Sequence, residues 1–273
     1  MFAIAKQKLM PVVIINDVSQ AEPLREALNQ GGIFTAEVTL RTPNALRIIQ
    51  IMSEDPDFCV GAGTVLSPGD ADKAQSAGAQ FVVSPGLSLA VVDECDRAAM
   101  PYFPGVSTPT EIQRARDLGF NELKFFPAEA LGGAQYLKAV VAPFHDMKFI
   151  PTGGINLTNV DSYLAVPQVL AVGGSWIVSE KLLAAGDFSA ITCESEGAIF
   201  EFPEAGTVYL VIRGGAIGSG SYGSNGVVID NVTVQSLGSF ALAVVSDFEF
   251  ETSDLTTVFT NTSANATSYA WDF

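Results

Sequence analysis

Short apolar runs alternate with helix-like segments from residue 11 to about 187, and this alternation constrains the fold more than any other feature. Runs of this length indicate buried strands. Strict alternation of strands with helices indicates a parallel sheet with right-handed crossovers. Eight repeats predict an α/β fold, a closed (β/α)₈ TIM barrel, with a doubly wound open sheet as the alternative. The eight runs are 11–15, 33–40, 59–64, 80–85, 102–107, 122–127, 148–154 and 169–174.

Capping residues mark several of the expected helix starts. Thr42, Ser67 and Thr108 each precede a proline, so each is placed to cap a helix that begins with that proline. Ser19 and Thr108 are each followed three residues later by a glutamate, which is the spacing of a capping box. These signals predict helices between the apolar runs.

The composition changes near residue 190. The following sequence is rich in Gly, Ser, Val and Thr, alternates in the manner of strands, and shows no helical stretch. We therefore expect a barrel domain at 1–190 and a β-rich tail at 191–273. The tail weakly resembles β-sandwich modules, of the carbohydrate-binding kind in "GVVIDNVTV" and of the polycystic-kidney-disease kind in "TSYAWDF". Its abrupt end favours a truncated or non-native fusion, with a real fusion as the alternative.

The charge balance limits the partners. The formal net charge of −16 argues against nucleic acid and anionic membranes, although small anions respond to local groups instead. No apolar run reaches the roughly 18 residues of a spanning helix. The three cysteines are scattered without metal-ligand spacing, so we expect no metal site and a reducing compartment. The start of the chain predicts a first strand rather than a signal peptide, which favours a cytoplasmic protein.

Lys124 stands out because it lies inside the apolar run "ELKFFP", with Phe126 on the same strand face. Lysine is rarely buried without a partner or a function. In one reading its stem packs on the sheet and its ammonium reaches water. In the other its amine attacks a carbonyl, because burial lowers the pKa of a lysine and only the neutral amine is nucleophilic. The resulting protonated Schiff base would stabilise a neighbouring carbanion, as carbon–carbon bond cleavage requires.

Other polar residues fall at the carboxyl ends of the expected strands, where barrel enzymes place their sites. Glu37 is the candidate proton shuttle for the lysine chemistry. Alternatively, Glu37 pairs with Arg41, a residue that is also suited to bind a substrate carboxylate through two parallel hydrogen bonds. Thr64 ends the third strand, within "GAGT".

Glycines follow the last two expected strands, in "PTGG" and "GGS". Glycines let backbone amides approach a ligand, and a helix N-terminus favours an anion. The loops after strands seven and eight are the common phosphate site of such barrels. We therefore predict a phosphate cradle with a helix in "WIVSEKLL", against the alternative of two ordinary turns. The cradle residues are Gly153, Gly154, Gly174 and Ser175, with Thr152 beside them.

Seven motifs occur in the order and near the spacing of the 2-keto-3-deoxy-6-phosphogluconate (KDPG) aldolases: "EVTLRT", "GAGTVL", "AQFVVSPGL", "PGVSTPTE", "LKFFPAEA", "FIPTGGI" and "AVGGSW". Residues 5–192 resemble this family, above all its bifunctional bacterial form, which also acts on 4-hydroxy-2-oxoglutarate. The resemblance implies a cytoplasmic class I aldolase without metal or other cofactor. It also implies a homotrimeric (β/α)₈ barrel whose small phosphorylated keto-acid substrate yields pyruvate and glyceraldehyde 3-phosphate. The family's long terminal helix is expected to form only in short part.

The same resemblance implies roles for single residues. Lys124 would form the Schiff base with the C2 carbonyl, and Glu37 would act as general acid and base through a water. The substrate-binding residues would be Arg41, Thr64, Phe126 and Thr152, with the first two at the carboxylate of the pyruvate moiety. The distal, phosphate end would be lined by Thr152, Gly153, Gly154, Gly174 and Ser175.

Two alternatives stay open at the level of the sequence. The first keeps the chemistry and changes the substrate, to the phosphogalactonate epimer or to unphosphorylated 4-hydroxy-2-oxoglutarate, because loop geometry reads stereochemistry. The second is a secreted carbohydrate-binding or adhesion protein, which depends only on the tail at 191–273.

Overall fold

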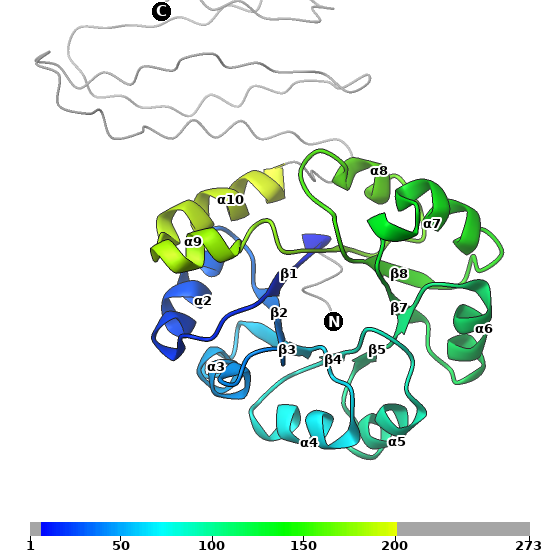
Figure 1. The fold of residues 1–273 in the computed structure, drawn as a ribbon, viewed down its shortest axis with the longest axis horizontal. Helices are drawn as coiled ribbons and strands as arrows, with labels where there is room; N and C mark the ends of the chain where they lie inside the picture. Colours follow the sequence, from blue (N-terminus) through cyan, green and yellow to red (C-terminus); the bar gives the residue numbers. More distant parts are fainter. Residues whose placement is uncertain (1–6, 201–273) are drawn as a thin grey trace, which may run out of the picture. The chain divides into compact units, whose positions relative to one another are not determined.

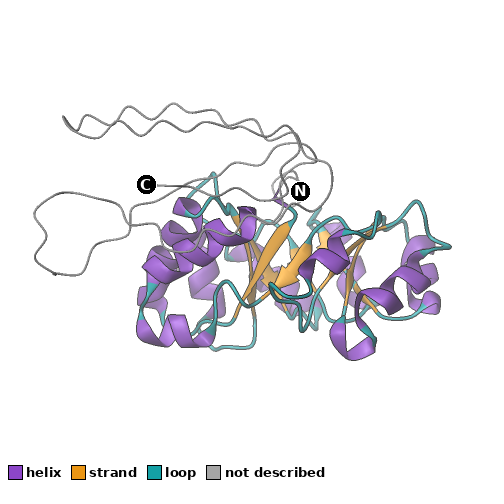
Figure 2. Ribbon diagram, turned by 90° about the horizontal axis from the view of Figure 1, so that it is seen from above, coloured by secondary structure: helices purple, strands orange, loops and turns teal. Residues whose placement is uncertain are grey.

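The computed structural model describes residues 7–200, and the expectations for residues 201–273 lie outside the described residues. In Figure 1 the strands form a central ring and the helices an outer ring. Figure 2, turned by 90°, shows helices on the flanks of the strands. The described part of the chain is a parallel (β/α)₈ barrel, as the alternation predicts.

Every predicted apolar run overlaps a strand, although β1 begins two residues before its run, and every strand pairs in parallel with its neighbours. The hydrogen-bonded order is β5-β4-β3-β2-β1-β9 in one sheet and β6-β7-β8 in the other. The strands are β1 (Leu9–Val13), β2 (Thr35–Thr39), β3 (Cys59–Gly63), β4 (Val82–Val83), β5 (Tyr102–Phe103), β6 (Gly105–Val106), β7 (Glu122–Phe125), β8 (Lys148–Pro151) and β9 (Val172–Gly174).

The two sheets close into one barrel at two places. Strands β5 and β6 are one barrel strand interrupted at Pro104, which has no N–H to donate. The carbonyl of Pro104 nevertheless accepts a hydrogen bond from the Lys124 amide at 3.0 Å. On the other side, a parallel bridge between Thr152 and Gly173 joins β8 to β9. Eight barrel strands result within residues 7–200, which rules out the open sheet there.

The helices follow the strands and bury one face each. In α3, Ala45, Ile48, Ile49 and Met52 are buried at the spacing of one helical stripe. The helical segments are η1 (Val18–Gln20), α2 (Ala21–Gln30), α3 (Ala45–Met52), α4 (Pro68–Ser76), α5 (Leu89–Arg97), α6 (Pro109–Asp117), η2 (Glu129–Leu131), α7 (Gly133–Val141), α8 (Val160–Leu164), α9 (Glu180–Ala185) and α10 (Phe188–Phe200). None of these described helices has both the length and the apolar character needed to cross a membrane.

The apolar core has two layers because every strand is covered on both faces. All five residues of β2 are buried, for example, as expected for a strand between a filled barrel and a ring of helices. A small inner cluster fills the barrel, and a larger one packs the strands against the helices. The inner cluster consists of Met10, Phe81, Val83, Phe103, Ile150 and Ala171.

Two of the predicted caps are present and two are wrong. Ser67 and Thr108 each form a complete capping box, at the starts of α4 and α6. Ser19 instead lies inside η1 and donates its hydroxyl to Asp17, which is the actual cap. The hydroxyl of Thr42 donates to the carbonyl of Ile15 at 2.6 Å, and α3 begins three residues later. In both failures the hydroxyl donates to another acceptor, a local one for Ser19 and a tertiary one for Thr42.

Helix α10 corrects the expectation of a strand-like segment from residue 191 and of only a short piece of terminal helix. Residues 191–200 continue a helix of 13 residues that packs on α2. Its buried stripe is Ile191, Ser195 and Ala198. A side chain on Gly31 would lie 2.3 Å from the Ser195 Cβ, so the two helices meet closely there. Small residues make this contact, which is why a search for large apolar residues misses it.

Candidate active site

Lys124 and Glu37 meet inside the barrel although they lie on strands β7 and β2, which are not neighbours. The Lys124 Nζ donates to Glu37 Oε1 at 3.0 Å and to Oε2 at 3.2 Å. Lys124 is 6% exposed and Glu37 is 1% exposed. The ammonium therefore does not reach out to water, and the carboxylate pairs with Lys124 rather than with Arg41. Buried ion pairs cost desolvation energy, so they call for a reason beyond stability.

Glycine on β3 makes room for the carboxylate. A Cβ on Gly63 would lie 2.2 Å from Glu37 Oε1, closer than any real contact. The next residue, Thr64, has a φ of 58°, which is an outlier for a β-branched side chain. Backbone strain of this kind concentrates at functional sites. The end of β3 is therefore shaped around the charged pair.

Phe126 and Arg41 lie close to this pair in the sequence, but only Phe126 contacts it, and Arg41 is exposed. The Lys124 Nζ lies 5.5 Å from the centre of the Phe126 ring, within range of a cation–π contact. A cis peptide bond joins Phe126 to Pro127. Arg41 lies two residues after the end of β2 and is exposed, and no acidic side chain in residues 7–200 pairs with it.

The predicted phosphate-end residues come together at the carboxyl ends of β8 and β9. A Cβ on Gly173 would lie 2.2 Å from the Thr152 hydroxyl, so the two strand ends touch. Gly153 and Gly154 have φ values of 102° and 80°, a region that favours glycine. Ser175 is exposed at the end of β9.

One feature of the predicted cradle is wrong, because no helix begins at the glycines. After Gly174 the chain makes turns, and α9 begins only at Glu180, with Ser179 as its cap. After Gly154 the chain likewise loops before α8 begins at Val160. Both helices are short. Backbone amides of the loops, rather than helix termini, are the groups that this end of the barrel can offer to an anion.

The structure adds residues that the motifs do not single out. Trp176 lies over Gly174 so closely that a Cβ there would fall 1.6 Å from a ring carbon. The Tyr163 hydroxyl donates to Glu129 Oε1 beside the glycine loop. Burial, followed by the hydrogen bond to Glu129 and its charge, raises the pKa of Tyr163 far above its ordinary value. The role of Gly63 can be predicted from the sequence, because a glycine inside a strand often marks a place where another group approaches the backbone closely.

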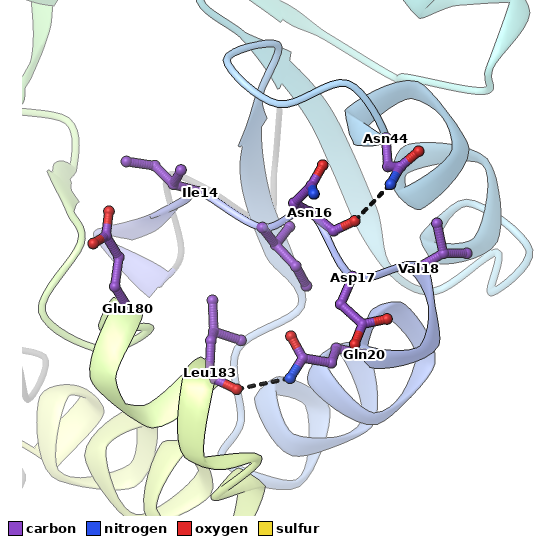
Figure 3. A pocket seen from close by; sticks show the side chains of 9 residues that line it. Ile14, Asn16, Asp17, Val18, Gln20, Asn44, Glu180 and Leu183 are labelled. Carbon is purple, nitrogen blue, oxygen red and sulfur yellow. Dashed lines mark hydrogen bonds between the residues drawn. The ribbon is translucent and has the colours of Figure 1, made fainter.

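A separate pocket of about 630 Å³ opens at the same end of the barrel (Figure 3). It lies between the loop after β1 and α9, where Gln20 donates to the carbonyl of Leu183 at 2.7 Å. Its lining does not include the predicted site residues: it consists of Ile14, Ile15, Asn16, Asp17, Val18, Gln20, Asn44, Glu180 and Leu183. This hollow is therefore separate from the site that the sequence predicts around Lys124 and Glu37.

A buried amine paired with a carboxylate inside a (β/α)₈ barrel is the arrangement of a class I aldolase, a carbon–carbon lyase that works through a Schiff base. Among the described residues, no group of three or more His, Cys, Asp or Glu side chains is placed to hold a metal ion.

Comparison with known proteins leads to the same class. The family model "KDPG and KHG aldolase" matches residues 2–193. A 2-dehydro-3-deoxy-phosphogluconate aldolase of Treponema pallidum is 47% identical over 195 residues, covering 71% of this chain and 93% of the relative. The KHG/KDPG aldolase of Escherichia coli is 44% identical, covering 67% and 87%.

A solved structure supports the likeness in three dimensions. The KDPG aldolase of Legionella pneumophila, with pyruvate captured as a covalent carbinolamine, is 41% identical, with a TM-score of 0.70. The match covers 72% of this chain and 96% of that one. The present chain belongs to the KDPG and KHG aldolase family.

Proposed function

We propose that this chain cleaves 2-dehydro-3-deoxy-6-phosphogluconate to pyruvate and glyceraldehyde 3-phosphate, and also 4-hydroxy-2-oxoglutarate to pyruvate and glyoxylate. The observation that carries the proposal is the buried contact of 3.0 Å between Lys124 Nζ and Glu37 Oε1. The second substrate is supported by the E. coli relative, whose name contains both activities.

The first half of the mechanism forms the Schiff base. Glu37 takes a proton from the Lys124 ammonium, directly or through a water, and the free amine attacks the C2 carbonyl of the substrate. The carbinolamine that results loses its hydroxyl as water, with a proton from Glu37, and becomes a protonated imine. The strained end of β3 at Thr64, together with Arg41, would hold the substrate carboxylate.

The second half breaks the carbon–carbon bond. A base, for which Glu37 is the candidate, removes the proton of the C4 hydroxyl, and the electron pair of the C3–C4 bond moves into the imine. An aldehyde leaves, and the enamine of pyruvate remains on Lys124. Protonation at C3 and hydrolysis of the imine release pyruvate and restore the amine. The ring of Phe126 would pack against this intermediate, and its distance from Nζ supports that role.

Cleavage rates on three substrates test the proposed substrate. Cleavage should be measured with 2-dehydro-3-deoxy-6-phosphogluconate, with its phosphogalactonate epimer and with 4-hydroxy-2-oxoglutarate. We expect the highest kcat/KM on the first and clear activity on the third. A higher kcat/KM on the epimer would replace the proposed substrate, and absence of pyruvate from all three would end the proposal.

The phosphate end has its own test. Ser175→Asp places a negative charge on an exposed residue beside Gly174, so KM for the phosphorylated substrate should rise about tenfold or more. The unphosphorylated substrate should be affected much less. Ser189→Asp, at an exposed position on α10, is the control for the added charge. An equal loss on both substrates would remove the phosphate assignment.

We further propose that the enzyme is a cytoplasmic homotrimer, which the resemblance to the family supports. Light scattering after size exclusion should then give three times the mass of the chain. A monomer with full activity would contradict the trimer and leave the chemistry untouched.

A further inference from the structure

The glycine loop after β8 is tied to the segment that follows the lysine strand. The amide of Ala128 donates to the Thr152 carbonyl at 2.9 Å, and the amide of Glu129 donates to the Gly153 carbonyl at 3.0 Å. Both donors come within five residues of Lys124 along the chain. The loop of positive-φ glycines is therefore held by the same segment that carries the proposed nucleophile.

The side chain of Glu129 supports this loop from one side. A Cβ on Gly154 would lie 2.6 Å from the Glu129 Cβ and 2.8 Å from its Cγ, so the glutamate stem fills that space. Its Oε1 accepts a hydrogen bond from the hydroxyl of Tyr163. Tyr163 is fully buried in α8, the helix that follows the glycine loop. The glutamate thus links the segments that precede and follow the loop.

Glu129 places a carboxylate beside the glycine loop that is proposed to bind phosphate. Within residues 7–200, no lysine or arginine forms a salt bridge with Glu129. A carboxylate beside an anion-binding loop would by itself weaken phosphate binding through repulsion. A hydrogen bond from a buried hydroxyl to a carboxylate is strong and directional. The position of Glu129 is therefore better explained by its hydrogen bond to Tyr163, which fixes the loop, than by its charge.

We propose that Glu129 and Tyr163 are positioning residues that set the distance between Lys124 and the loop at Gly153 and Gly154. The inference rests on the proposed function, since it takes that loop as the seat of the substrate phosphate. Displacement of the loop would then impair phosphorylated substrates selectively, because an unphosphorylated substrate makes no use of it.

The test is a set of single variants measured on both 2-dehydro-3-deoxy-6-phosphogluconate and 4-hydroxy-2-oxoglutarate. Tyr163→Phe keeps the buried ring and removes only the donor, and Glu129→Ala removes the stem and the acceptor. Each should raise KM for the phosphorylated substrate about tenfold and leave kcat nearly unchanged. Glu129→Gln keeps the stem and an acceptor oxygen, so it should restore a KM close to that of the parent enzyme.

The control is Tyr136→Phe, which removes the same hydroxyl from a tyrosine that donates to the Ser107 carbonyl at 3.0 Å. It should leave the preference for the phosphorylated substrate unchanged. Equal losses on both substrates, or no loss in Tyr163→Phe and Glu129→Ala, would overturn the positioning role. If Tyr163→Phe fails to fold, the KM values of Glu129→Ala alone test the positioning role, because Glu129 is exposed and its replacement disturbs the core less.

Failure of the proposed function looks different from failure of the positioning role. A parent enzyme that shows no preference for the phosphorylated substrate would remove the phosphate assignment before any variant is compared. A parent enzyme with that preference, retained in full by both variants, would remove only the role of Glu129 and Tyr163.

Discussion

Among single residues, Glu37 and Lys124 form a buried ion pair inside the barrel. Replacing a buried ion pair by apolar residues often leaves a protein as stable or makes it more stable. Glu37 and Lys124 are therefore poor candidates for stabilisers of the barrel. An amine and a proton acceptor in contact, shielded from water, are instead what Schiff-base chemistry requires.

A single added methyl group tests whether the position of Glu37 matters. Gly63→Ala places a Cβ 2.2 Å from Glu37 Oε1, so the carboxylate has to move. Because displacement by about 1 Å can cost a factor of about 100, kcat should fall by that order. Gly69→Ala is the matched control, since its nearest neighbour would lie 3.9 Å away. Comparable rates in both variants would show that the observed place of Glu37 is not required.

Much of the site is predictable at this scale, and the limits have physical causes. Alternation along a strand puts Lys124 and Phe126 on one face, and the motifs bring Glu37 to the same end of the barrel. The direct contact is not predictable, because β2 and β7 are separated in the barrel and their distance depends on strand tilt. Nor is the close contact of Trp176 with Gly174 predictable, because turns replace the first part of the expected helix, which begins only at Glu180.

At the scale of elements, hydrogen-bonded caps fix where the helices begin. The start of α6 is the best case: Glu111 Oε2 accepts from the Ser107 amide at 2.7 Å and from the Thr108 amide at 2.9 Å. Partial burial by itself would raise the pKa of Glu111, but the hydrogen bonds from Ser107 and Thr108 outweigh it and lower the pKa below its ordinary 4.5.

This lowered pKa predicts a pH-dependent contribution of the cap. Because the folded-state pKa lies below the unfolded-state value, the stabilisation is present above about pH 4.5 and is lost as the pH falls through the folded-state pKa. Glu111→Gln should lower the free energy of unfolding by about 0.5–1 kcal/mol at pH 7. The difference from the parent protein should shrink toward acid pH in denaturant titrations. A difference that stayed constant with pH would contradict the account, and Glu26→Gln, at an exposed position on α2, controls for charge removal.

Prediction succeeded for whole elements and failed at particular ends. Ser67 and Thr108 cap as expected, and within residues 7–200 each hydroxyl accepts only from an amide of its own helix. Thr42 does not cap a helix, and its hydroxyl instead donates to the carbonyl of Ile15 in the loop after β1. Helix α10 was unexpected because Ser195 and Ala198 make a small-residue stripe, whose burial depends on the close approach of Gly31.

Across the described chain, residues 7–200, the proposed reactive centre lies within the barrel itself. The parallel strands β2 and β7 hold Glu37 and Lys124 inside the barrel, and the glycine loops follow the carboxyl ends of β8 and β9. All ten predicted site residues fall within the described residues 7–200. We therefore predict that residues 201–273 take no part in the chemistry.

A shortened chain tests this independence. A chain that ends at residue 200 keeps all of α10 and its contact with α2, so kcat and KM should match those of the full chain. Circular dichroism would establish that the shortened chain is folded. A folded but inactive product would assign residues 201–273 a part in catalysis.

Borohydride trapping of the full chain with pyruvate, followed by peptide mass mapping, tests whether Lys124 is the nucleophile. We expect one reduced adduct, on Lys124, and none in Lys124→Met treated in the same way. A folded parent chain that gave no adduct, or gave one only on another lysine, would contradict the assignment of Lys124 as the nucleophile.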